Sequence, residues 1–103
     1  DIRNSKVLDI INELKRWSLN VVVSDPWADP EEVKREYGIS LVEINKIEDV
    51  DSLLVAVGHN EYRGMKPKDL MNICKNENAV IADIKAIFDK NELQEWGFEV
   101  FRF

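Results

Sequence analysis

His59 and Lys85 are the side chains whose type and position best suit ligand binding. His59 follows an apolar segment, residues 52–57, and Gly58, which allows the chain to turn sharply. An imidazole at such a turn can donate a hydrogen bond or carry a proton near neutral pH. Lys85 follows a second apolar segment by two residues, so its ammonium group can reach a phosphate there. The residues alone leave the ordinary alternatives open: a histidine that caps a helix or meets solvent, and a solvated lysine.

The carboxylates and the cysteine indicate neither a catalytic centre nor a metal site. Asp25 and Asp83 end separate apolar segments, so no spacing pairs them as acid and base, and we expect both to organise turns. The single histidine has no cysteine or carboxylate at metal-ligand spacing. The GxGxxG dinucleotide motif and the GxxxxGK[ST] phosphate loop are also absent. We therefore predict no catalytic, cofactor-binding or metal-binding residue in this segment.

Charge and composition exclude some classes of partner. The formal net charge is -6, which argues against a nucleic-acid binder but leaves a small anionic ligand open. No apolar run approaches the roughly 18 to 20 residues that span a bilayer, and the first ten residues do not have the layout of a secretory signal. Cys74 is the only cysteine, which excludes an internal disulfide and favours a reducing, cytoplasmic location.

The order of the expected elements predicts one α/β domain over residues 1–103. Apolar residues at three- and four-residue spacing, caps and breakers predict helices over residues 3–17, 30–38, 67–75 and 91–96. Apolar and β-branched runs predict strands over residues 20–24, 40–43, 52–57, 79–83 and 98–101. Alternating strands and helices favour a three-layer, Rossmann-like sandwich whose parallel sheet has about five strands and helices on both faces. Ligands of such sheets bind beyond the carboxyl ends of the strands, where His59 and Lys85 are expected.

Five segments in order resemble a known enzyme family. They are DIRNS (residues 1–5), VVVSDP (21–26), SLLVAVGHNEYR (52–63), AVIADIKAIFD (79–89) and NELQEWGFEVFRF (91–103). Together they resemble the C-terminal, UDP-binding domain of the UDP-glucose/GDP-mannose dehydrogenase family. Within that family the sequence looks closest to UDP-N-acetylhexosamine 6-dehydrogenases of surface polysaccharide biosynthesis.

The resemblance implies an NAD-dependent oxidation of the sugar C6 alcohol to a carboxylate. In the family, NAD and the catalytic cysteine belong to an N-terminal region that this chain does not match, and Cys74 in MNICKN does not match the catalytic segment. The chain alone is therefore expected to be inactive and to bind no cofactor. The matching positions imply substrate binding by Lys85, where the family has arginine, by His59, and by Arg3 of the D-x-R-x-S segment.

The expected partners are a UDP-sugar and the rest of the parent enzyme, with no nucleic acid and no membrane. In the family the central strand of this sheet precedes the D-x-R-x-S segment, so the resemblance implies either that the sheet closes without it or that exposed edges pair in a homodimer. A non-catalytic α/β interaction or dimerisation module is the alternative. A receiver domain fits poorly, because Asp25 stands alone at its strand end.

Overall fold

The computed structural model describes residues 4–76 and 78–102, so Arg3 lies outside the described residues. The chain divides into two compact units, Asp1–Ile47 and Glu48–Phe103. Each unit has its own hydrophobic cluster. The prediction of one domain over residues 1–103 stays a prediction.

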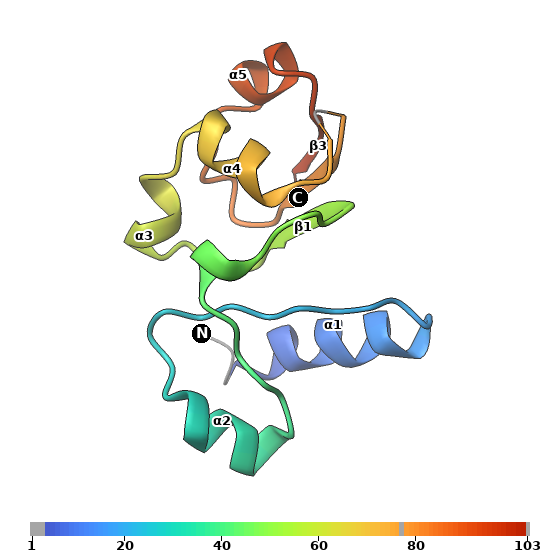
Figure 1. The fold of residues 1–103 in the computed structure, drawn as a ribbon, viewed down its shortest axis with the longest axis vertical. Coiled ribbons are helices and arrows are strands. Elements are labelled where there is room, and N and C mark those ends of the chain that lie inside the picture. The colour runs from blue at the N-terminus through green and yellow to red at the C-terminus, as the bar shows by residue number, and fades with distance from the viewer. Residues whose placement is uncertain (1–3, 77, 103) are drawn as a thin grey trace. The chain divides into compact units, whose positions relative to one another are not determined.

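The first unit contains two capped helices (Figure 1). Helix α1 spans Ser5–Arg16, and the Asn4 side chain caps it by accepting a hydrogen bond from the Lys6 N–H at 2.9 Å. Helix α2 spans Pro30–Tyr37, where Asp29 accepts from the first turn and Gly38 ends the helix with a left-handed φ of 69°. The sequence offers Asn4 or Ser5 as the cap of the first helix and Asp29 and Gly38 as the ends of the second, and the structure selects Asn4. The helices bury Ile11 and Val33, which pack with Ile39 in one cluster.

Two strands predicted for this unit are wrong, because the structure has no strand at either position. Residues 20–24 and 40–43 form one isolated parallel bridge, Val23 with Leu41, supported by a 2.9 Å hydrogen bond from the Val42 N–H to the Val23 carbonyl. Neighbouring structure keeps the pairing short. The Asp25 carboxylate closes a turn directly after Val23, and a 3₁₀ helix, Ile44–Lys46, begins soon after Leu41. A ladder needs several consecutive extended residues on both segments, and these turns interrupt both.

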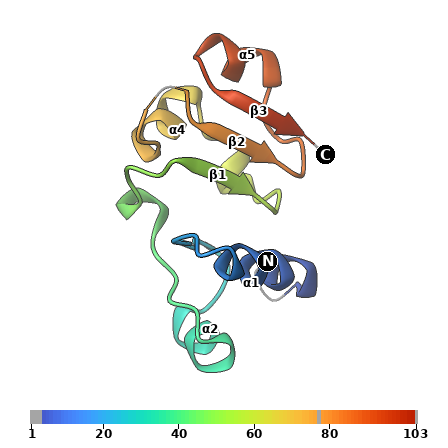
Figure 2. The same cartoon turned by 90° about the vertical axis from the view of Figure 1, so that its right-hand side faces the viewer.

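The second unit contains a parallel sheet of three strands, not about five. Strands β1 (Ser52–Val55), β2 (Val80–Asp83) and β3 (Glu99–Arg102) lie side by side in that order. All three arrows point in the same direction (Figure 2). Helices α3 (Asn60–Arg63) and α4 (Pro67–Ile73) lie in the connection from β1 to β2. Helix α5 (Lys90–Glu95) lies in the connection from β2 to β3. The one-turn helix α3 was not predicted.

The core of this unit lies on one face of the sheet. Ile81 and Val100 are buried and pack with Leu70 of α4 and Leu93 of α5. Alternate side chains point the other way: Leu54 and Phe101 are 42% and 49% exposed. Strands in chain order with right-handed connections place their helices on the same face, which explains this pattern. The three-layer, Rossmann-like arrangement with helices on both faces therefore stays a prediction for the chain.

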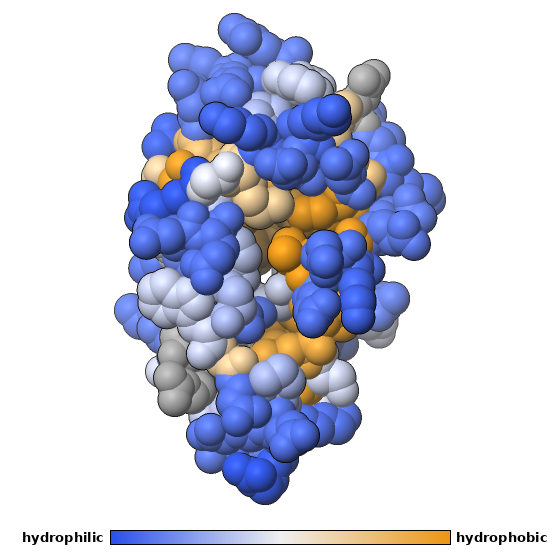
Figure 3. Space-filling model, turned by 60° about the vertical axis from the view of Figure 1, so that its left-hand side comes forward, coloured by the Kyte–Doolittle hydropathy of each residue, from blue (hydrophilic) through white to orange (hydrophobic). Residues whose placement is uncertain are grey.

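Exposed aromatic and aliphatic side chains also occur in both units. Figure 3 shows a surface that is mostly hydrophilic, with hydrophobic residues gathered in places among the charged ones. Trp17 and Trp27 are 69% and 59% exposed. Neither is therefore buried in a hydrophobic core, where a tryptophan is usually expected to pack. The Trp17 indole N–H donates to Glu13 Oε1 at 3.0 Å, which satisfies its polar atom at the end of α1.

Candidate functional site

The site predicted from the sequence falls at one edge of the three-stranded sheet. Because β1, β2 and β3 are parallel, their carboxyl ends share that edge. Gly58 and His59 follow β1, and Lys85 follows β2 by two residues. The structure therefore places His59 and Lys85 in loops at the same end of the sheet. Arg3, the third predicted substrate-binding residue, lies outside the described residues.

A buried carboxylate holds the loop after β2. Asp83 is the last residue of the strand and is completely inaccessible to solvent. Its Oδ1 accepts from the Ile87 N–H at 3.1 Å, and its Oδ2 accepts from the Phe88 N–H at 2.9 Å. Hydrogen bonds to a carboxylate are among the stronger ones in proteins, and here they satisfy two backbone donors of the loop. The prediction that Asp83 organises a turn is confirmed.

Lys85 is the only charged residue of the loop 84–88, and its side chain is exposed. Among the described residues it makes no hydrogen bond or ion pair. The next residue, Ala86, has a left-handed φ of 54°, a conformation that costs energy for a residue with a Cβ. The Lys85 ammonium group is thus carried by a tightly folded turn and remains available to an external anion.

His59 occupies a different environment from the one that its loop position suggested. It stands at the N-cap of α3 but makes no capping hydrogen bond with its side chain. Its residue is only 6% exposed, and its ring centroid lies 5.7 Å from that of Tyr62. The expectation that His59 caps a helix is therefore confirmed for its position but not for its side chain, and the expectation of contact with solvent is wrong. A substrate-binding role for His59 stays a prediction.

Arg63 is a second cation of this region that the sequence analysis did not single out. Its Nε donates to the Gly58 carbonyl at 2.9 Å, so the guanidinium folds back over the turn after β1. A Cβ at Gly58 would lie 2.7 Å from Arg63 Nη2. The absence of a side chain at Gly58 therefore allows the Arg63 guanidinium to approach the backbone closely. The only sequence signal is the five-residue spacing between a glycine and an arginine, which is too common to be informative.

A cavity of about 170 Å³ lies beside the loop that carries Lys85. Ile87 and Phe88 of that loop form part of its wall. Two cations, Arg63 and Lys66, and two acids, Asp89 and Glu92, complete the polar lining. The formal charges cancel, so the cavity suits a neutral polar group better than a pyrophosphate.

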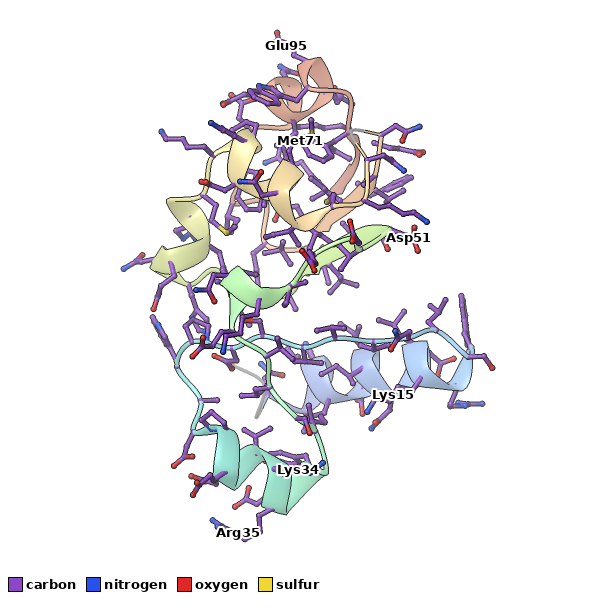
Figure 4. The ribbon with its side chains drawn as sticks, viewed as in Figure 1. Lys15, Lys34, Arg35, Asp51, Met71 and Glu95 are labelled. Carbon is purple, nitrogen blue, oxygen red and sulfur yellow. The ribbon has the colours of Figure 1, made fainter. Side chains whose placement is uncertain are left out.

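The first unit has a separate open groove of about 390 Å³ along α2. Lys34 and Arg35 project from this helix (Figure 4), and Lys34 Nζ lies 3.0 Å from Ser40 Oγ. Glu31 also lines the groove, and all four of these side chains are exposed. An exposed, mixed-charge lining without a buried polar group does not define a ligand site.

The remaining candidates do not indicate catalysis. Asp25 accepts from the Trp27 N–H at 2.9 Å, so it organises its turn as predicted. Burial raises the pKa of the Cys74 thiol to about 11, which keeps the thiol protonated and unreactive at neutral pH. Within residues 4–76 and 78–102, no three potential metal ligands gather, and no helix is long and apolar enough to cross a membrane.

Comparisons with known proteins connect this site to a family. Residues 1–90 match the model of the UDP-glucose/GDP-mannose dehydrogenase family, UDP binding domain. The chain is 40% identical over 87 residues to UDP-N-acetyl-D-glucosamine 6-dehydrogenase of Salmonella typhi, which covers 84% of the chain and 20% of that protein. It is 42% identical over 93 residues to Protein CapL of Staphylococcus aureus, covering 90% of the chain and 22% of that protein. A UDP-N-acetyl-D-glucosamine 6-dehydrogenase of Pseudomonas aeruginosa is 35% identical over 92 residues, 89% of the chain and 22% of that protein. The resemblance drawn from the sequence is confirmed.

Proposed function

We propose, because this chain belongs to the UDP-glucose/GDP-mannose dehydrogenase family, that it is the UDP-sugar-binding C-terminal part of a nucleotide-sugar 6-dehydrogenase. The chain spans about a fifth of the length of the curated relatives that it matches. Two of those relatives carry the name UDP-N-acetyl-D-glucosamine 6-dehydrogenase. The proposed reaction of the whole enzyme is oxidation of the C6 alcohol of a UDP-N-acetylhexosamine or UDP-hexose to the uronic acid, with NAD as oxidant, for surface polysaccharide biosynthesis.

The position of Lys85 is the observation that carries the proposal. Its ammonium group is exposed at the carboxyl end of β2, and no described residue neutralises it. A pyrophosphate is a dianion or trianion near neutral pH. An unpaired ammonium group therefore attracts it locally, although the net charge of the protein is -6. Lysine binds phosphate as a point charge, whereas the family's arginine forms a bidentate contact. We therefore expect a pyrophosphate contact with looser geometry than an arginine would give.

NAD does not fit the described residues of this chain. The loop after β1 contains Gly58 but no second or third glycine to let a pyrophosphate approach the backbone. The helix that follows, α3, has four residues, too few to present a helix N-terminus to a dinucleotide. The cofactor of the proposed enzyme is therefore assigned to the part of its chain outside residues 1–103.

The alternative, a non-catalytic interaction or dimerisation module, is not favoured, because the named relatives include dehydrogenases. Association with the rest of the enzyme and formation of a homodimer stay predictions. So do the cytoplasmic location and the roles of His59 and Arg3.

Titration of UDP against the complete enzyme tests the proposal. Lys85→Ala should raise the dissociation constant of UDP about 10- to 100-fold, the effect of losing a charge-assisted contact. Lys75→Ala is the matched control, since Lys75 is also exposed but precedes β2, at the amino end of the strand. An enzyme that does not bind UDP would refute the function, and equal effects of the two variants would refute the assignment of Lys85.

A further inference from the structure

We propose that Asp83 is a positioning residue for Lys85, which sets the place of the ammonium group at the carboxyl end of the sheet without itself touching the ligand. This inference rests on the proposed role of Lys85 in binding a pyrophosphate.

The first step is that Asp83 ties both ends of the loop together. As the last residue of β2, it is fixed by the strand pairings on either side. Its two carboxylate oxygens accept from Ile87 and Phe88, four and five residues further along the chain. The loop therefore closes around a side chain that is itself rigid and fully buried.

The second step is that the two ends of the loop, Ile84 and Phe88, are also held by the rest of the unit. The Ile84 N–H donates to the Val55 carbonyl at 3.0 Å, which extends the sheet by one residue. The Phe88 side chain is 8% exposed and belongs to the hydrophobic cluster. Only Lys85 and Ala86 are exposed within the loop. The backbone position from which the Lys85 side chain extends is therefore determined by these anchors.

The third step concerns the strained residue. Ala86 holds a left-handed φ of 54°, and its N–H donates to the Asp83 carbonyl at 3.3 Å. Alanine adopts this conformation only where the surroundings enforce it. The two hydrogen bonds to the Asp83 carboxylate supply that enforcement. Without them, we expect the backbone to relax and the ammonium group to move away from its binding position.

A double-mutant cycle in the complete enzyme, with UDP as the probe, tests this inference. Asp83→Asn keeps the size of the side chain but replaces one acceptor oxygen by a donor, so one of the two backbone bonds is lost. We expect it to weaken UDP binding about 3- to 10-fold when Lys85 is present, and to have no further effect in the Lys85→Ala background. A merely structural role would weaken both backgrounds equally.

The controls separate this inference from the proposed function. Asp89→Asn alters the neighbouring carboxylate, which caps α5 through the Glu92 N–H and bonds to no amide of the loop, and should leave UDP affinity unchanged. If wild-type enzyme fails to bind UDP, the proposed function is refuted, and if Lys85→Ala has no effect, the assignment of Lys85 is refuted before that of Asp83. If Lys85→Ala weakens binding but Asp83→Asn acts equally in both backgrounds, only the role of Asp83 is overturned.

A second variant covers the case in which Asp83→Asn does not fold. Asp83→Ser keeps a single acceptor oxygen in a smaller side chain, so at most one of the two bonds to the Ile87 and Phe88 N–H groups remains. It should weaken UDP binding about 2- to 5-fold with an unchanged circular dichroism spectrum, and only in the presence of Lys85. Unchanged affinity in this folded variant would overturn the inference.

Discussion

The Asp83 carboxylate accepts a hydrogen bond from the Phe88 backbone N–H at 2.9 Å, and both groups are buried. This contact joins the end of a strand to the start of the segment that leads into α5. It means that the exposed lysine between them stands on a loop whose conformation depends on a charge buried in the protein.

Removing the Asp83 carboxylate should destabilise the fold. Asp83→Ala leaves the N–H groups of Ile87 and Phe88 without their acceptor, and we expect a loss of about 2 to 4 kcal/mol in the free energy of unfolding. Urea denaturation followed by circular dichroism measures it. Asp89→Ala, which removes only an exposed cap, should cost about 1 kcal/mol. Equal losses would show that the buried contacts contribute no more than a surface cap.

The left-handed conformation of Ala86 predicts a stabilising substitution. Asparagine tolerates this region better than alanine, so Ala86→Asn should raise the free energy of unfolding by about 0.5 to 1 kcal/mol. Ala86→Val should act in the opposite direction, because a β-branched side chain is strained at positive φ. Thermal denaturation of the two variants checks the prediction. A more stable valine variant would contradict the conformation described for this residue.

Gly58 and Gly64 should respond differently to an added methyl group. Gly58→Ala places a Cβ 2.7 Å from Arg63 Nη2, so the guanidinium must move and its bond to the Gly58 carbonyl weakens. We expect a cost of about 0.5 to 1.5 kcal/mol. At Gly64 the nearest atom is Asn60 O at 3.7 Å and φ is -81°, so Gly64→Ala should be neutral or stabilising by about 0.5 kcal/mol.

The Gly58 effect depends on its arginine, which supplies a direct check. In the Arg63→Ala background the contact is gone, so Gly58→Ala should cause no further loss of stability. Thermal melts of the four proteins of this cycle give the coupling. An undiminished cost of Gly58→Ala without Arg63 would assign the strain to another part of the turn.

Burial of Cys74 predicts a loss of stability at alkaline pH. Its pKa rises from 9.0 to about 11 on folding, so between these values the folded state retains a proton that the unfolded state releases. Unfolding is then favoured as the pH increases, and stability should fall from about pH 9 upward. Urea denaturation between pH 7 and pH 10.5 measures the slope. Cys74→Ala should lack this part of the slope, and identical slopes would contradict the prediction.

Local sequence was sufficient wherever neighbouring residues decide the structure. Asn4, Asp29 and Gly38 delimit their helices as expected, because a cap satisfies backbone groups only two or three residues away. The apolar runs that became β1, β2 and β3 were also recognised, with ends shifted by a residue or two. The segments at residues 20–24 and 40–43 look similar in sequence but form only one bridge, because a strand also needs an extended neighbour of sufficient length.

The sequence by itself determined the family, the alternation of helices and strands, and the location of Lys85 after a buried strand. Only the tertiary structure decided that His59 is buried beside Tyr62, that Arg63 folds back onto Gly58, and that Asp83 accepts two backbone hydrogen bonds. The physical reason is that burial depends on which elements pack over a residue, and a turn's internal contacts depend on backbone angles that residue types restrict but do not specify. Lys85 and the turn at Asp83 could therefore be predicted from the sequence, whereas the complete burial of the Asp83 carboxylate and its two amide partners could not.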